Sequence, residues 1–414
     1  MTGEKRGVNF KSGALAERLA RESYGRLLAL LSARTRDVAA AEDALADAFA
    51  AALRAWPRTG APDNPEAWLF AAAKRKLIDA ARRAQTAASG EAEIVRGIEE
   101  MEAEAAARGS PDRRLGLLFA CAHPEIDAAA RTPLMLQTVL GLSAERIAAA
   151  FLVAPAAMSQ RLVRAKKRIA EAAIPFDVPA PEQWAARLDG VLHAIYAAYA
   201  EGWSDAEGAD PARVALAEEA IWLAGVLAQQ LPDEPEAIGV LALLLHLEAR
   251  RPARRVEGRF VPLQEQDAAL WRVDLQGEAE LLLMKAAEFG RIGRFQLEAA
   301  IQSAHASRRA RGQADWDAIV LLYEALAQFS SSPAVPLNRA AAVAQRDGPE
   351  AGLAALDALE APALRSYQPY WALRASVLAE LGRVEEARAA FDEAMARERD
   401  VAVIRFLAER RAQL

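Results

Sequence analysis

The chain has 414 residues and a mass of 44.6 kDa, enough for two to four domains at about 100–200 residues each. Hydrophobic residues make up 53% and charged residues 26%, which excludes wholesale disorder because such a chain can bury real cores. One cysteine, Cys121, excludes a disulfide scaffold and a four-cysteine zinc site. No apolar run reaches the ~18 residues of a membrane span, and no secretory signal pattern opens the sequence, so we expect a cytoplasmic protein. Alanine, leucine, arginine and glutamate dominate, which predicts an all-α fold.

The net charge of −6 is unevenly distributed. Residues 1–175 hold 26 Lys and Arg against 21 Asp and Glu, a net of +5, whereas the remaining residues carry a net of −11. This asymmetry predicts an N-terminal part that faces nucleic acid and a different role for the rest.

The first expected elements are two amphipathic helices. Leucines 15, 19, 27, 28 and 31 recur at helical spacing, and a second pattern runs from Val38 to Trp56 and ends at Pro57. A loop with two prolines and a glycine follows, after which Asn64 is the expected N-cap and Pro65 the first residue of a helix that ends near Arg83. Residues 87–110 lose this periodicity and gather glutamates, which indicates an acidic linker, either a tether or an autoinhibitory segment.

A second helical unit is expected over residues 111–175. Gly141 and Ser143 cap one helix, and Pro155 starts the next. The proline-rich segment 175–181 is the expected domain boundary, and helical patterns continue from residue 182 to the C-terminus.

The last part of the chain is repetitive. Gly348 and Gly382 lie 34 residues apart, and one stretch has the spacing of a tetratricopeptide helix pair. The alternative is an ordinary bundle of α-hairpins. The residues that carry the pattern are Trp371, Ala375, Leu378, Gly382, Ala387, Phe391 and Ala394.

The helix that starts at Pro65 is strongly basic, because five of its ten residues from 74 to 83 are Lys or Arg. Clustered cations beside a loop can neutralise phosphates, while Trp68 or loop residues can stack on an unpaired base. The alternative interpretation is a solvated basic helix with a tryptophan in the core.

Residues 143–168 have the spacing of apolar residues that is typical of a helix-turn-helix. Ile147, Ala148 and Phe151 form the expected inner face of the first helix, and short outward residues at the start of the second allow close approach to base edges in a major groove. A generic amphipathic hairpin is the alternative. The expected inner face of the second helix consists of Met158, Leu162, Ala165 and Ile169.

In this order, the elements resemble the extracytoplasmic-function sigma factors of bacterial RNA polymerase. The stretch 41–56 is similar to the family's polymerase-binding element, 68–83 to its −10 element, and 143–168 to its −35 reader. The resemblance implies a sigma factor that binds core RNA polymerase and promoter DNA and catalyses nothing itself. The implied DNA-binding residues are Trp68, Lys74, Arg75, Lys76, Arg82, Arg83, Ala156, Ala157, Ser159, Gln160, Arg161, Arg164, Lys167 and Arg168, and the implied polymerase-binding residues are Asp37, Glu42, Asp43, Asp47, Phe49 and Trp56.

The resemblance extends to a subgroup with a long helical C-terminal extension, which implies a regulatory domain with an intramolecular or protein partner. The subgroup-like segments are 199–203, 231–236, 249–254, 295–301 and 337–340. The expected domains are therefore 12–86 (sigma region 2-like), 87–110 (linker), 111–175 (sigma region 4-like), 182–300 (helical extension) and 301–414 (tetratricopeptide-like repeats).

Enzyme chemistry has little support in the sequence. Cys121 and His123 lie two positions apart, but the other histidines are isolated and no phosphate-binding glycine loop is present. We therefore expect no metal and no cofactor. The alternative functions are a helix-turn-helix transcription activator with a repeat-type interaction domain, and a tetratricopeptide adaptor that does not bind DNA.

Overall fold

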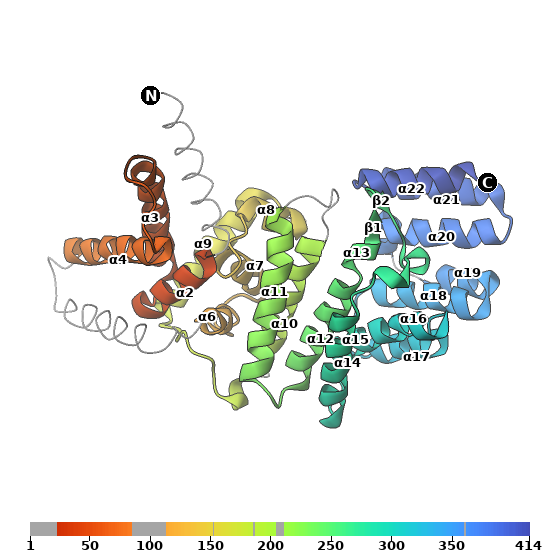
Figure 1. Cartoon of the computed structure of the whole chain (residues 1–414), viewed down its shortest axis with the longest axis horizontal. Helices are drawn as coiled ribbons and strands as arrows, with labels where there is room; N and C mark the ends of the chain where they lie inside the picture. The colour runs from red at the N-terminus through yellow and green to blue at the C-terminus, as the bar shows by residue number, and fades with distance from the viewer. Residues whose placement is uncertain (1–22, 85–112, 152, 185–186, 204–210, 360–361) are drawn as a thin grey trace. The chain divides into compact units, whose positions relative to one another are not determined.

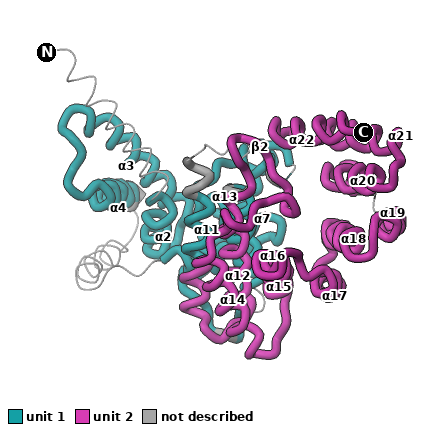
Figure 2. Tube along the Cα trace, turned by 45° about the vertical axis from the view of Figure 1, so that its right-hand side comes forward, with its two compact units in different colours: residues 1–202, 214–223 teal, residues 203–213, 224–414 magenta. Residues whose placement is uncertain are grey.

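The computed structural model describes residues 23–84, 113–151, 153–184, 187–203, 211–359 and 362–414. These residues form an all-α fold, as predicted, interrupted by one pair of two-residue strands (Figure 1). The chain divides into two compact units, residues 1–202 with 214–223 and residues 203–213 with 224–414 (Figure 2). The predicted linker over residues 87–110 lies outside the described residues.

The first unit is helical throughout its described residues. It includes residues 214–223 of the helix Pro211–Gln230, whose first three and last seven residues belong to the second unit, as does Trp203. Its elements are α2 (Tyr24–Thr35), α3 (Val38–Thr59), α4 (Pro65–Ala84), α6 (Arg114–Cys121), α7 (Ala128–Thr138), α8 (Ala144–Ala150), α9 (Pro155–Glu171), the 3-10 turn Pro181–Gln183, α10 (Leu188–Trp203) and α11 (Pro211–Gln230).

The boundaries of α3 and α4 follow local sequence signals. The Asp37 side chain accepts the Ala40 N–H at 3.0 Å and starts α3, and the Asn64 side chain accepts the Ala67 N–H at 3.0 Å and starts α4. The expected end of α3 at Pro57 is wrong. The helix continues to Thr59 because the Gly60 N–H donates to the Trp56 carbonyl at 3.0 Å and closes one more turn.

The first unit extends beyond residue 175, where the sequence predicts a boundary, because α10 and α11 contact helices of the helix-turn-helix part. On α6, Arg114 forms an ion pair with Glu219 and its guanidinium lies 4.1 Å from the Trp222 ring centre. On α8, Arg146 pairs with Glu201 at 3.1 Å. Separation at residue 175 would therefore leave the buried Arg114 without its carboxylate.

The second unit consists of helices and a short β-hairpin. From α15 onward, apart from the one-turn helix α16, each helix packs against the next in chain order, as expected for a stack of helix pairs. The elements are α12 (Pro235–Ala249), α13 (Arg251–Arg254), β1 (Arg255–Val256), β2 (Arg259–Phe260), the 3-10 turns Leu263–Glu265, Ala268–Leu270 and Pro362–Ser366, α14 (Val273–Glu288), α15 (Arg294–Ala306), α16 (Arg308–Arg311), α17 (Trp316–Leu326), α18 (Ala334–Asp347), α19 (Pro349–Asp357), α20 (Gln368–Glu380), α21 (Val384–Ala396) and α22 (Val401–Ala412).

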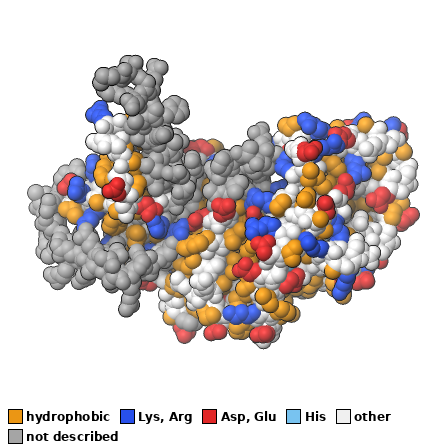
Figure 3. Space-filling model, viewed as in Figure 1, with side chains coloured by type: hydrophobic (Ala, Val, Ile, Leu, Met, Phe, Trp, Pro, Cys, Tyr) orange, Lys and Arg blue, Asp and Glu red, His pale blue; other side chains and the backbone are white. Residues whose placement is uncertain are grey.

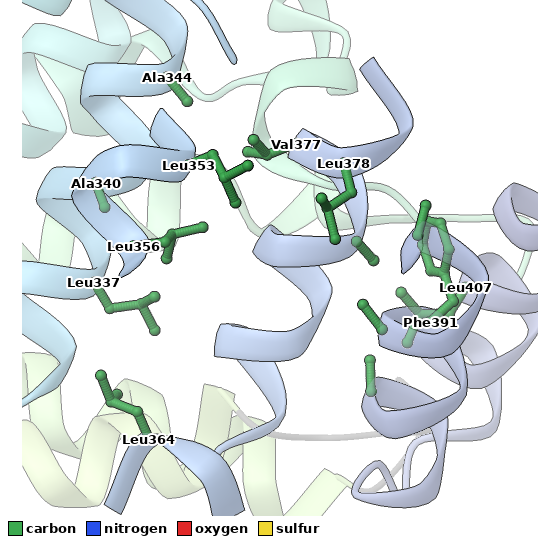
Figure 4. Close-up of a cluster of buried hydrophobic side chains, with 14 residues drawn as sticks. Leu337, Ala340, Ala344, Leu353, Leu356, Leu364, Val377, Leu378, Phe391 and Leu407 are labelled. Carbon is green, nitrogen blue, oxygen red and sulfur yellow. The ribbon is translucent and has the colours of Figure 1, made fainter. Parts of the chain in front are cut away.

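One hydrophobic cluster joins the helices from α18 to α22 (Figure 4). Ala375 and Ala387 are small enough to let α20 and α21 approach closely, and Phe391 fills the space beside them, as the sequence predicts. Gly348 and Gly382, which lie 34 residues apart, both have a positive φ, 97° and 69° respectively. Gly348 ends α18, and Gly382 follows the end of α20.

Two of the subgroup-like segments meet at the start of α15. The Glu236 carboxylate on α12 accepts the N–H groups of Phe295 and Gln296 at 2.9 and 3.0 Å. Gly293 lies so close that a Cβ there would be 2.3 Å from the Glu236 Cδ. These contacts give the segments 231–236 and 295–301 a shared structural role, the joint between α12 and α15.

The β-hairpin contacts the last helix of the second unit, 145 residues further along the chain. Arg255 forms an ion pair with Asp400, both with side chains 15% exposed, and Arg259 pairs with Glu409 at 2.6 Å. We name this hairpin–α22 contact the clasp. These strands were not predicted from the sequence, because two residues are too few to show the alternating periodicity of a strand.

The excess acidic charge of the second unit is dispersed on the face seen in Figure 3, where acidic and basic side chains alternate over the C-terminal helices. Many of them pair locally: Arg374 with Asp357 at 2.5 Å, and Arg383 with Glu386 at 2.6 Å. Exposed pairs of this kind keep a surface solvated and contribute about 0–1 kcal/mol each.

Candidate nucleic-acid and polymerase interface

The hairpin of α3 and α4 is held together by two tryptophans. Trp56 is only 1% exposed, and its ring meets the half-buried Trp68 edge to face, with 5.5 Å between ring centres. Leu69 and Ala73 complete the buried side of α4. The indole pair therefore fixes the loop between the two helices, residues 60–64, which is the expected site for an unpaired base.

The basic residues of α4 occupy its outer side. Arg75 and Lys76 are exposed and Lys74 is half-buried. Lys76 pairs with Asp47 of α3 at 3.1 Å, with both side chains more than half exposed, so this contact is weak enough to exchange for a phosphate. The side chains of Arg82 and Arg83 lie outside the described residues.

The residues predicted to bind polymerase occupy different environments along α3. Asp43 and Asp47 are exposed, and Phe49 is half-buried. Asp37 is the N-cap of the helix, and Trp56 is part of the core. Glu42 is 16% exposed at its side chain and forms an ion pair inside the unit.

The second helix of the helix-turn-helix is oriented as predicted. Ser143 caps α8 by accepting the Arg146 N–H, and Pro155 is the first residue of α9. The predicted inner residues of α9 are all buried. For the first helix, Ile147 and Ala148 are buried but the prediction for Phe151 is wrong. This side chain is 37% exposed, because α8 ends at Ala150 and the helical phase no longer holds one residue later.

The outward side of α9 carries the predicted DNA-facing residues. Arg161 is half-buried and donates to the Ala129 carbonyl at 3.3 Å. Lys167 and Arg168 make exposed ion pairs with Glu171 and Glu125. Because exposed ion pairs contribute little free energy, both cations can leave them and bind phosphates instead. The exposed members of the set are Ala156, Ala157, Ser159, Gln160, Arg164, Lys167 and Arg168.

Two residues of this region are missing from the predicted set. Lys166 on α9 is buried and pairs with Glu42. Tyr24 on α2 hydrogen-bonds the same carboxylate through its hydroxyl. Burial raises the pKa of Tyr24, and the charge and hydrogen bond of Glu42 raise it further. Lys166 lies four positions after the inner residue Leu162, so helical spacing alone could have placed it on the buried side of α9.

Cys121 and His123 do not form a reactive pair. The Cys121 thiol is buried 3.5 Å from the Thr138 hydroxyl, and burial raises its pKa to about 12, so it stays a neutral thiol. The His123 Nδ1 accepts the Glu125 N–H at 3.2 Å. Within the described residues, no group of three or more His, Cys, Asp or Glu is placed to hold a metal ion.

Comparisons with known proteins identify the class of protein. Residues 19–87, which include α2, α3 and α4, match Sigma-70 region 2, and residues 187–287 match a family of unknown function (DUF6596). An uncharacterized protein of Rhizobium meliloti is 42% identical over 386 residues, which cover 89% of this chain and 91% of that protein. No solved structure matches. The chain is thus a sigma-factor-like protein, and it belongs to the family of this Rhizobium meliloti protein.

The Sigma-70 region 2 match gives the protein a non-catalytic role in promoter recognition and transcription initiation, and it implies core RNA polymerase and promoter DNA as partners. None of the described helices has the length and apolarity needed to cross a bilayer.

Proposed function

We propose that the protein is an extracytoplasmic-function sigma factor with a built-in regulatory extension, acting in the cytoplasm without a cofactor. Its α3–α4 hairpin binds core polymerase and the −10 strand, and α9 reads the −35 groove. The observation that carries this proposal is the Sigma-70 region 2 match over the residues that form the hairpin.

The α3–α4 hairpin suits capture of a −10 strand. The Trp56–Trp68 contact holds the loop at residues 60–64 in place, and Arg75 and Lys76 are exposed on the adjoining helix. Energy for melting then comes from stacking unpaired bases and neutralising phosphates, each base contributing about 1–3 kcal/mol. Trp68 and the loop receive the base, and the α4 cations hold the backbone.

The α9 helix suits a major groove about 12 Å wide. Its first turns expose Ala156, Ala157 and Ser159, which are short enough to bring Gln160 to base edges. Arg164, Lys167 and Arg168 follow toward the C-terminus and suit phosphates.

The regulatory role of the extension is supported by its contacts with the helix-turn-helix part. Glu201 on α10 pairs with Arg146 on α8, the helix that supports α9. A partner that moved α10 would therefore act on the −35 reader directly. In this proposal residues 301–414 are tetratricopeptide-like repeats that bind the protein partner, a role favoured by the serial packing of α15 to α22.

The test is in vitro transcription with core polymerase and the full-length protein on a promoter library, with permanganate detection of melted DNA. We expect open complexes on a subset of promoters, and loss of at least tenfold in their yield for Arg164→Ala with Lys167→Ala. Arg405→Ala, which removes an exposed arginine of α22, is the matched control and should change nothing.

The alternatives give different results in the same experiment. Salt-dependent DNA binding without any open complex would leave the transcription-activator function. Absence of DNA binding altogether would leave the adaptor function. The role of the extension is tested by a chain that ends after Gln230, since this end retains the Arg114 contacts that a cut at residue 175 removes.

A further inference from the structure

The Sigma-70 region 2 part and the helix-turn-helix part are joined by a buried ion pair. Glu42 on α3 contacts Lys166 on α9, with side chains only 16% and 10% exposed, although 124 residues separate them. The Tyr24 hydroxyl hydrogen-bonds the same carboxylate. The charges of Glu42 and Lys166 both act on the buried Cys121 thiol of α6, so the pair lies inside the unit.

A second close contact joins the same two parts. Gly25 on α2 lies against the end of α7, where a Cβ would be only 1.8 Å from the Val139 carbonyl oxygen. Gly141, just beyond α7, lies against the Tyr24 ring, with 3.4 Å from its own Cβ position to the ring. Backbone-to-backbone approach of this kind leaves no room for a water layer, so α2 and α7 form a dry contact.

The contact has a chemical consequence for any partner of α3. A carboxylate with little access to water is strongly unfavourable unless a cation remains beside it. A partner that displaces α9 from this face of α3 must therefore bring its own lysine or arginine to Glu42, into a position beside the Tyr24 hydroxyl.

We propose that the structure is a closed state in which α9 occupies, through Lys166, the face of α3 that receives core polymerase. A basic side chain of the polymerase then replaces Lys166 at Glu42 and releases α9 for the −35 element. This inference rests on the proposed sigma-factor function and adds the residue-level competition to it.

The two promoter elements could not be read at once in the closed state. Their positions, −10 and −35, are about 25 base pairs apart, or about 85 Å of B-form DNA. The helices α3 and α9 touch at Glu42 and Lys166, and even the longer one, with 22 residues, extends only about 33 Å at 1.5 Å per residue. Release of α9 is therefore required before both elements are bound.

The single cysteine provides a native probe of this opening. Cys121 is fully buried on α6, which packs against α2 and α7, so separation of the two parts uncovers it. The rate of maleimide labelling of the full-length protein is measured with and without core polymerase, and co-elution with polymerase is recorded on the same samples. We expect slow labelling alone and labelling at least tenfold faster when polymerase is bound.

Charge reversal tests the ion pair itself. Lys166→Glu places two carboxylates together, and we expect at least tenfold faster labelling without polymerase. The swapped pair Glu42→Lys with Lys166→Glu should restore slow labelling and lose the response to polymerase. Gly25→Ala should also speed labelling, whereas Gly277→Ala, a helix glycine facing open space, is the control and should not.

The outcomes separate this inference from the proposed function. Co-elution with polymerase at an unchanged Cys121 labelling rate overturns the competition at Glu42. Wild-type labelling rates in both Lys166→Glu and Gly25→Ala overturn the closed state. Absence of co-elution instead contradicts the sigma-factor function, while the charge-swap comparison still decides whether the closed contact exists.

Discussion

The Glu236 carboxylate accepts the Phe295 N–H at 2.9 Å, across 59 positions of sequence, and so caps a helix to which it does not belong. The Gln296 N–H and side-chain amide donate to the same carboxylate at 3.0 and 3.3 Å. Burial nevertheless dominates, and it raises the pKa of Glu236 above its ordinary value.

This raised pKa predicts how the stability of the second unit depends on pH. Because the folded protein holds the proton more tightly than the unfolded chain, the contribution of Glu236 is fully present below pH ~4.5 and is lost as pH rises through the folded pKa. Glu236→Gln keeps an acceptor and cannot titrate. As pH rises from 4.5 to neutrality, we expect the urea midpoint of the variant to increase relative to that of the wild type. A constant difference between the two over this range would contradict the prediction.

Replacement of two helix glycines by alanine should change the free energy of unfolding in opposite directions. A Cβ at Gly352 would lie 2.3 Å from the Ala344 Cβ, where α18 and α19 pack together, so Gly352→Ala should destabilise by about 1–3 kcal/mol through overpacking. Gly277 faces open space, so Gly277→Ala should stabilise by about 0.5–1 kcal/mol through helix propensity alone. Urea unfolding of both variants measures the difference, and equal signs would refute the packing at Gly352.

Alanine substitutions of different exposed side chains of α9 should change the affinity for DNA and the sequence specificity separately. Arg164→Ala with Lys167→Ala should weaken binding to all −35 sequences, and should reduce the salt slope of log K by about 0.9 for each lost phosphate contact. Gln160→Ala should leave the salt slope unchanged and relax the preference at one base position, by about 1–3 kcal/mol. Fluorescence anisotropy over a salt series provides both quantities. A shared effect on slope and preference would mean that α9 docks in another orientation.

The Trp56–Trp68 contact predicts separable structural and base-stacking effects. Trp68→Ala removes the ring that meets Trp56, so the first unit should lose about 2–4 kcal/mol of unfolding free energy. Trp68→Phe retains most of the packing, so its stability should fall by less. If Trp68 stacks on an unpaired base, the phenylalanine variant should still melt promoters in the permanganate assay. A phenylalanine variant that is stable and melts no promoter would assign the indole a specific contact.

The sequence was sufficient to predict a helix boundary or the buried face of a helix where these depend only on residues nearby in the chain. The start of α4 at Pro65 follows from Asn64 and from the fixed φ of proline. The inner face of α9 follows from spacing alone, since Met158, Leu162 and Ile169 are all buried. The pairing of α20 with α21 follows from small residues at the spacing of a helix pair.

Tertiary contacts decided the features that the sequence did not predict. The pairing of Lys166 with Glu42 was not predicted, because the two residues are 124 positions apart and only the fold brings them together. Glu236 belongs to a segment that could be recognised only as similar to a subgroup, and its capping role depends on where Phe295 lies. Phe151 shows the limit of helical spacing, which fails one residue beyond the end of α8.

The clasp affects the order in which contacts of the second unit form and the rate at which amide hydrogens of α22 exchange. In an open array of helix pairs the terminal helix has a neighbour on one side only and exchanges its amide hydrogens first. Here α22 is also fastened to the hairpin by Arg255–Asp400, a contact that spans 145 residues. Contacts so distant in sequence form late, because the intervening chain must already be ordered. We therefore expect α22 to form its contact with the β-hairpin late in folding. Once this contact has formed, the amide hydrogens of α22 should exchange only when the whole stack of helices opens.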